Sequence, residues 1–231
     1  MSTVVSITQI NAAEDLLSKA IGPYSTILAD PPWQFQNRTG KVAPEHRRLL
    51  RYPTLGVEEI KHLPVGRLAA AKSHLYLWVP NALLQEGLEV MRMWGFTYKT
   101  NIVWSKVRKD GGPDGRGVGF YFRNVTELVL FGIRGSMRTL QPGRTQVNFI
   151  SSRKREHSRK PDEIYSLIER CSPSPYLELF ARFSRPGWDQ WGNEDVEQNS
   201  FHGVAKRNGH SGTEQLRLLE RLKGYLSRPE E

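Results

Sequence analysis

Two consecutive prolines, Pro31 and Pro32, directly follow an acid and an apolar run in the segment STILADPPWQF, residues 25–35. Each proline fixes its own φ and has no backbone N–H, so no helix or central strand continues through the pair. The apolar residues before Asp30 are therefore expected to form a strand that stops at this acid. The carboxylate of Asp30 is then expected at an edge of the sheet to which this strand belongs.

Short apolar runs with β-branched and aromatic residues recur along the chain, and several are apolar nearly throughout, which is typical of strands covered on both faces. They lie at 25–29, 74–79, 98–104, 126–132, 146–150 and 176–180. Patterns typical of helices lie between them, at 56–71, 81–95 and 160–171. This alternation predicts an α/β fold with a mostly parallel sheet and helices on both faces.

Asp30 follows the first of these strands, and Arg182 closely follows the last one. In sheets of this kind the ligand crevice lies outside the carboxyl ends of the strands. A crevice between the ends of these two strands is therefore expected.

The length of 231 residues fits one domain with a short appendage. We expect a domain over 1–195, followed by a polar linker and an amphipathic helix within 196–231. No apolar run approaches the roughly 20 residues that span a membrane, and the N-terminus lacks the pattern of a signal peptide, which predicts a cytoplasmic location. Cys171 is the only cysteine and the histidines show no ligand spacing, so no protein-bound metal is expected.

The formal net charge of +9 indicates a polyanionic partner, because phosphate neutralisation is the main source of non-specific affinity for nucleic acid. Basic residues gather in three stretches that also have the composition of loops, and these include Arg47, Arg48 and Arg116. These three arginines are expected to contact the substrate. Solvated surface loops of a basic protein are the alternative interpretation of the same charges.

The residues Asp30 to Trp33 together suit recognition of an amino group attached to an aromatic ring. The carboxylate and the carbonyls beside the prolines can accept its N–H groups, and Trp33 offers a surface on which the ring could stack. An adenine N6 or a cytosine N4 has this pattern. Acceptors outside the ring plane would expose the lone pair of the amine, and Asp30 would stabilise the positive charge that develops as a methyl group is transferred. A strand end with a turn is the alternative interpretation.

Eight segments in series resemble the N6-adenine methyltransferase family that includes the catalytic subunit of the messenger-RNA adenosine methyltransferase. They are ADPPW at 29–33, YPTL at 52–55, LYLWV at 75–79, MWGF at 93–96, IVWSK at 102–106, HSRKPDEIYSLIER at 157–170, LELFAR at 177–182 and WGNE at 191–194. The resemblance implies a Rossmann-like methyltransferase domain with S-adenosylmethionine as the methyl donor. It also implies a permuted order, in which the catalytic motif precedes the cofactor-binding segment.

The resemblance assigns roles to individual residues. The catalytic acid is implied to be Asp30, and the amine site is completed by Pro31, Pro32 and Trp33. Tyr52 resembles a tyrosine near both the donor and the target base, and Glu127 resembles an acid on the side of the target adenosine. Lys160 resembles a lysine that lies between the target and the donor. The residues implied to contact the cofactor are Asp30, Lys160, Glu178, Arg182, Asn193 and Glu194.

The segment after Arg182 departs from the family pattern. A His-Asn pair is common there, whereas this chain has Phe183, Ser184 and Arg185. Glu194 stands where an amide is common, although a carboxylate can equally accept hydrogen bonds from ribose hydroxyls.

Together, these residues predict an enzyme that transfers a methyl group from S-adenosylmethionine to the N6 amino group of adenine in nucleic acid. DNA is the expected substrate rather than RNA, because the basic residues lie in loops beside the site and no zinc-finger RNA module is present; an adenine in duplex DNA would have to be flipped out. Two alternatives stay open, namely a non-catalytic nucleic-acid-binding subunit and an N4-cytosine methyltransferase. The protein partners considered are a second copy of the chain and a methyltransferase-like subunit.

Overall fold

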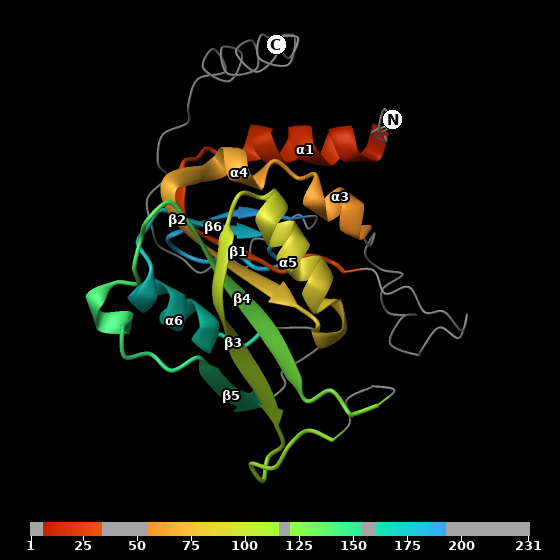
Figure 1. The fold of residues 1–231 in the computed structure, drawn as a ribbon, viewed down its shortest axis with the longest axis vertical. Coiled ribbons are helices and arrows are strands. Elements are labelled where there is room, and N and C mark those ends of the chain that lie inside the picture. The colour runs from red at the N-terminus through yellow and green to blue at the C-terminus, as the bar shows by residue number, and fades with distance from the viewer. Residues whose placement is uncertain (1–6, 34–54, 116–120, 154–159, 193–231) are drawn as a thin grey trace. The chain divides into compact units, whose positions relative to one another are not determined.

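The computed structural model describes residues 7–33, 55–115, 121–153 and 160–192, and within these ranges the strands form one sheet (Figure 1). The strand order is β5-β3-β4-β2-β1-β6-β7. The strands are β1 Tyr24–Ala29, β2 Ala69–Val79, β3 Thr97–Val107, β4 Thr126–Arg134, β5 Phe149–Arg153, β6 Tyr176–Leu179 and β7 Trp188–Trp191. Neighbouring strands are parallel except at β4, which runs antiparallel to both β2 and β3. The expectation of a mostly parallel sheet is confirmed.

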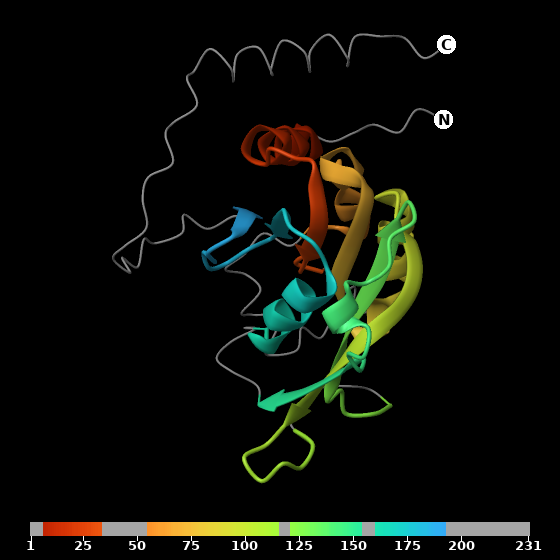
Figure 2. The ribbon, with the colours of Figure 1, turned by 90° about the vertical axis from the view of Figure 1, so that its left-hand side faces the viewer.

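Helices cover both faces of this sheet, as predicted. They are α1 Ile7–Lys19, α3 Val57–Lys61, α4 Val65–Leu68, α5 Leu84–Met93 and α6 Glu163–Cys171, with the short 3-10 turns η1 Asn81–Leu83 and η2 Gln141–Gly143. Helices α1, α3, α4 and α5 share one apolar core with alternate strand residues, and α6 packs against the other face. Figure 1 shows α5 in front of the sheet, and Figure 2 shows α6 to one side of the strands.

Strand β2 shows how the sequence creates these two cores. Leu75 and Leu77 are fully buried on the α5 side, whereas Tyr76 and Trp78 are buried on the α6 side. Successive side chains of a strand point to opposite faces, so a run that is apolar throughout needs cover on both.

The single helix predicted over 56–71 is interrupted around Pro64 and is wrong over residues 69–71. The chain forms two short helices instead, with Pro64 between them, and residues 69–71 begin β2. Ala69 pairs in parallel with Tyr24 of β1. Alanine favours helices, but strand pairing in the sheet outweighs this weak local preference. The sequence patterns also missed α1 and β7, and β5 begins three residues later than expected.

The order of the strands creates a switch point between β1 and β6. The chain leaves β1 and returns as its neighbour β2, whereas it leaves β6 and returns as β7 on the opposite side. Connections that diverge in this way leave an open crevice outside the carboxyl ends of the two strands. Asp30 directly follows β1, so the topology places it at this crevice.

A buried polar network joins β2 to the end of α6. The ring Nδ1 of His74 lies 2.7 Å from the Ser172 hydroxyl, which also lies 2.7 Å from the Tyr76 hydroxyl. His74 and Ser172 are fully buried. Burial lowers the pKa of His74 below its ordinary value, against a weaker opposing contribution from the carbonyl of Met137.

This network predicts an acid-sensitive fold. Below about pH 6.5 the unfolded chain takes up a proton at His74, whereas the folded chain keeps His74 neutral. His74 therefore costs the fold no stability above that pH, and the free energy of unfolding falls as the pH drops below it. Replacing His74→Gln should remove up to about 1.4 kcal/mol per pH unit from the slope of unfolding free energy below pH 6.5. Urea unfolding at several pH values measures this slope. As a control, Tyr76→Phe loses a hydrogen bond in the same network and should lower stability without flattening the slope; equal slopes in all three proteins would contradict the assignment.

Candidate active site

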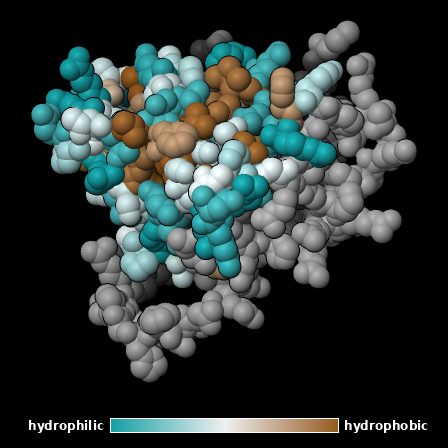
Figure 3. All heavy atoms as spheres, turned by 90° about the horizontal axis from the view of Figure 1, so that it is seen from below, coloured by the Kyte–Doolittle hydropathy of each residue, from teal (hydrophilic) through white to brown (hydrophobic). Residues whose placement is uncertain are grey.

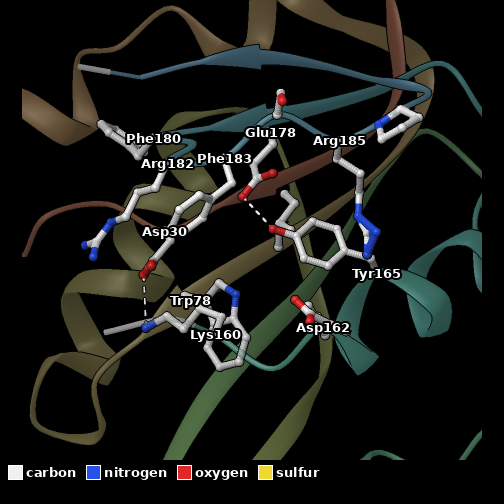
Figure 4. Close-up of a pocket in the computed structure, with 14 residues that line it drawn as sticks. Asp30, Trp78, Lys160, Asp162, Tyr165, Glu178, Phe180, Arg182, Phe183 and Arg185 are labelled. Atoms are coloured by element: carbon white, nitrogen blue, oxygen red, sulfur yellow. Dashed lines mark hydrogen bonds and ion pairs between the residues drawn. The ribbon is translucent and has the colours of Figure 1, made fainter. Parts of the chain in front are cut away.

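A cavity of about 300 Å³ lies at the carboxyl ends of β1 and β6. This volume falls at the lower end of the range of small-molecule sites. Asp30 from the end of β1, Glu178 from β6 and Tyr165 from α6 line it, as Figure 4 shows. Lys160, just before α6, and Arg182, just after β6, complete the polar part of the lining. The crevice predicted between the first and last apolar strands of the sequence is therefore present.

Four side chains of alternating charge form a continuous cluster beside this cavity. The ammonium nitrogen of Lys160 lies 3.2 Å from an oxygen of Asp30 and 2.8 Å from an oxygen of Glu127. The second oxygen of Glu127 accepts a hydrogen bond from Lys106. Only 15 to 25% of each side chain is exposed. Glu127 and Lys160, which were predicted from separate sequence segments, thus meet at Asp30.

Two tryptophans support the lysines of this cluster. The ammonium nitrogen of Lys160 lies 4.8 Å from the ring centre of Trp78, and that of Lys106 lies 4.9 Å from the ring centre of Trp104. The two rings contact each other edge to face at 5.8 Å. Cations over aromatic faces are attracted by the ring quadrupole, so the aromatic pair helps to hold both lysines in place.

The carboxyl groups of the cluster differ in their pKa. Burial raises the pKa of Asp30 above its ordinary value, although the positive charge of Lys160 opposes this, and the nearby negative charge of Glu127 adds to the rise. Burial also disfavours ionisation of Glu127, but Lys160 and Lys106 outweigh it and hold the pKa at about 2. Glu127 is therefore a fixed anion, whereas the charge of Asp30 depends on its surroundings.

Trp33 occupies a different place from the one expected. Its side chain is 5% exposed and packs in the core shared with α1 and α5. Its indole N–H donates to the carbonyl of Trp78 at 2.8 Å, and its backbone pairs with Leu55. In this structure Trp33 therefore anchors the Asp-Pro-Pro turn and presents no face for stacking. Its backbone N–H also donates to the carbonyl of Pro31 at 2.8 Å, so one of the two acceptor positions of that oxygen is occupied.

Glu178 has one satisfied and one unsatisfied oxygen. The hydroxyl of Tyr165 donates to Oε1 at 2.8 Å, whereas Oε2 is buried without a hydrogen-bond partner. Burial raises the pKa of Glu178 to about 7; the Tyr165 hydrogen bond opposes the rise and the charge of Asp30 adds to it. Buried acceptors are normally paired, so an orphaned carboxylate oxygen at a cavity indicates a missing donor. The sequence singled out Glu178 but not Tyr165, whose place in the helical pattern gave no such signal.

The segment after β6 bends sharply toward the cavity. Phe180 has a φ of 64°, a conformation that is rare for a bulky side chain and is retained where the surroundings enforce it. The ring of Phe180 packs edge to face on Trp191 of β7 at 5.2 Å, and the backbone N–H of Ala181 donates to the carbonyl of Trp191. Arg182 follows at the cavity mouth, and the guanidinium of Arg185 stacks on the ring of Tyr165 at 3.9 Å.

Six predicted site residues lie outside the described residues, and the structure tests none of them. These are Arg47, Arg48, Tyr52, Arg116, Asn193 and Glu194. Within the described residues, no group of three or more His, Cys, Asp or Glu side chains is arranged to hold a metal ion. The described helices also include none that is long and apolar enough to cross a membrane.

Comparison with known proteins gives consistent matches. The MT-A70 family model matches residues 24–194. The N(6)-adenosine-methyltransferase MT-A70-like of Arabidopsis thaliana is 30% identical over 180 residues, which cover 75% of this chain and 24% of that protein. The N(6)-adenosine-methyltransferase catalytic subunit METTL3 of Homo sapiens is 30% identical over 178 residues, which cover 75% and 28%. The Type II methyltransferase M.MunI of a Mycoplasma species is 29% identical over 187 residues, which cover 74% and 77%. The chain thus spans about a quarter of the length of the first two relatives and about three quarters of M.MunI.

The charged cluster makes a prediction about Asp30. Replacing Lys160→Met removes the nearest positive charge, so the pKa of Asp30 should rise further above its ordinary value. Carboxyl-carbon NMR titration of labelled aspartate measures the change. Lys61→Met is the matched control, because Lys61 also bridges two carboxylates, Glu58 and Glu89, but does so away from the cavity. If both variants leave the titration of Asp30 unchanged, Lys160 does not control its charge.

Proposed function

Because the chain belongs to the MT-A70 family, we propose that it transfers a methyl group from S-adenosylmethionine to the N6 amino group of an adenine in nucleic acid. One observation carries the proposal: a largely buried carboxylate, Asp30, stands at the switch-point cavity with Lys160 beside it. A carboxylate in such a position can contact a substrate that binds in the crevice.

Asp30 has the chemistry that an amine substrate requires. Its carboxylate accepts an N–H of the exocyclic amine, and the free acceptor position of the Pro31 carbonyl is available for the second N–H. Negative charge in a site with little water stabilises the positive charge that develops on nitrogen as the new N–C bond forms. The amine must finally lose a proton, and the raised pKa of Asp30 makes its carboxylate a better acceptor for that proton than an exposed aspartate.

The residues at the cavity fit the proposed methyl donor. The unpartnered Oε2 of Glu178 can accept from an ammonium group or a ribose hydroxyl, and Arg182 provides a cation for a carboxylate. When bound, S-adenosylmethionine supplies an activated methyl group on a positively charged sulfur. Lys160 contacts Asp30 and lines the same cavity, so it is placed to keep Asp30 ionised while donor and target are both present.

We propose DNA as the substrate rather than RNA. The basic residues predicted to contact phosphates, Arg47, Arg48 and Arg116, lie in segments that adjoin the site in the sequence, and the net charge of +9 favours a long polyanion. Base chemistry of this kind needs a target that is single-stranded or flipped out of the duplex.

The central prediction concerns Asp30. Wild-type protein incubated with labelled S-adenosylmethionine should label single-stranded DNA, duplex DNA or RNA, and nucleoside analysis should give N6-methyladenine. Asp30→Asn keeps the shape but loses the charge, so the rate should fall by about a hundred-fold or more. Lys61→Met serves as a control that should keep full activity.

Other results would change the assignment. N4-methylcytosine as the product would replace adenine with cytosine as the target. Binding of nucleic acid by a wild-type protein that binds no S-adenosylmethionine would favour a non-catalytic subunit. Equal labelling by wild type and Asp30→Asn would remove Asp30 from the chemistry.

A second prediction concerns Glu178. Its ionised form is needed to accept from the donor, and its pKa is about 7, so affinity for S-adenosylmethionine should be retained above pH 7 and should fall roughly ten-fold from pH 8 to pH 6. Isothermal calorimetry measures this. Glu178→Gln should bind more weakly and lose this pH dependence. Tyr165→Phe keeps the carboxylate but removes its hydrogen-bond donor, so the fall should begin at a higher pH; a pH-independent affinity in wild type would exclude Glu178 from the donor site.

A further inference from the structure

Two adjacent aromatic side chains, Tyr121 and Phe122, project into solvent just before β4. They are 95% and 86% exposed, more than any other large apolar or aromatic side chain among the described residues. Single exposed apolar residues are common on protein surfaces, but two neighbouring aromatic rings with almost no cover indicate a surface that something else contacts.

Further basic side chains lie at the end of β3, which pairs with the start of β4 just after this aromatic pair. Arg123 follows it directly and is exposed. Residues 106–114 form a small hairpin at the end of β3, closed by hydrogen bonds from Arg108 to Gly112 and from Asp114 to Lys106, and this hairpin exposes Arg108 and Lys109. Figure 3 views the molecule from the end where β3 finishes, and both hydrophobic and hydrophilic side chains occur on that face. We call Arg108, Lys109, Tyr121, Phe122 and Arg123 the β3–β4 surface.

The β3–β4 surface lies at the same edge of the sheet as the active-site cavity. Strand β1 is parallel to β2, and β2 and β3 are each antiparallel to β4, so β3 runs in the same direction as β1. The carboxyl end of β3 therefore lies at the edge where β1 and β6 end. Arg123 is four residues from Glu127, which contacts Lys160, so at most about 14 Å of chain separates it from the charged cluster.

We propose that the β3–β4 surface binds the single-stranded nucleic acid that flanks the target adenine, with Tyr121 and Phe122 stacking on bases and Lys109 and Arg123 contacting phosphates. The inference rests on the proposed function, because it takes the target to be a base within a polynucleotide. Aromatic faces interleaved with cations are the usual platform for unpaired bases, since every base has a face that stacks.

Charge favours nucleic acid over a protein as the occupant. Arg123 directly follows the aromatic pair, and Asp110, which is the exposed acid of the hairpin, accepts two hydrogen bonds from Arg108. A polyanion with aromatic bases complements both parts of this surface. An apolar protein surface would complement only the two rings.

The experiment measures binding of fluorescein-labelled single-stranded DNA and RNA oligonucleotides of one sequence with a single adenine. Each is also made with the bases beside that adenine removed to leave abasic sites. The double variant Tyr121→Ala/Phe122→Ala should bind the intact strands about five- to a hundred-fold more weakly for each stacked base that is lost. Removal of the flanking bases should reduce the affinity of this variant less than that of wild type, because the substitutions and the missing bases delete the same contact.

Salt dependence separates the two kinds of contact. The aromatic variant should keep the wild-type salt slope, because the rings neutralise no phosphate, whereas Lys109→Ala/Arg123→Ala should flatten the slope. Tyr98→Ala is the matched control, because Tyr98 is a half-exposed tyrosine at the opposite end of β3. Thermal unfolding verifies that all variants fold.

The outcomes distinguish this proposal from the proposed function. If wild type transfers methyl groups and the aromatic variant binds the oligonucleotides with full affinity, the role proposed for the β3–β4 surface is wrong but the proposed function stands. If the aromatic variant loses affinity as expected but wild type transfers no methyl group, the proposed function is wrong and the β3–β4 surface still binds nucleic acid. Unchanged binding with a loss of self-association in sedimentation would make the surface an interface between copies of the chain, and would equally overturn the proposal.

Discussion

Strand β1 pairs in parallel with β2 on one side and with β6 on the other, and both ladders end at Ala29, where the Asp-Pro-Pro sequence begins. This double pairing fixes the position of Asp30, because the residue after a buried central strand has little freedom. It also fixes the cavity, since β1 and β6 continue in opposite directions across the sheet and leave their carboxyl ends open. The prolines stop the ladder at the point where a carboxylate is needed.

The charged cluster beside Asp30 is better explained by function than by stability. Transferring several charges from water to a site where only a small part of each side chain is exposed is costly, and even well-paired buried ions often contribute little net stability. The alternation of Asp30, Lys160, Glu127 and Lys106 limits this cost, because each charge has an opposite neighbour. Its effect on Asp30 is specific: Lys160 lowers the pKa that burial and Glu127 raise. A carboxylate with opposing influences of this kind is typical of a site that binds or moves protons.

The sequence predicted those parts of the fold and site that depend on local chemistry. The strand that ends at Asp30 follows from the two prolines, and the α/β class follows from apolar runs that alternate with amphipathic segments. The error over residues 56–71 arose because pairing with Tyr24 is a long-range contact, which outweighs the helical preference of three alanines. The sequence did not single out Lys106, yet it lies at the end of β3 and pairs with Glu127. No local pattern shows which lysine meets a buried acid on the neighbouring strand.

Trp33 illustrates how a correct motif can suggest a wrong contact. An aromatic ring beside an amine site was expected to stack on the base, but the indole is buried and donates to the backbone of Trp78. The ring of Trp78 lies under the ammonium group of Lys160, which in turn contacts Asp30. Trp33 therefore fixes the turn that carries Asp30 and also holds the strand end that supports the partner of Asp30. The buried indole of Trp33 thus helps to position both Asp30 and Lys160. We infer that Trp33 affects the reaction by holding these two side chains in place and not by contacting the substrate. Under the proposed function, stacking on the substrate is therefore assigned to rings that are exposed at the same edge of the sheet.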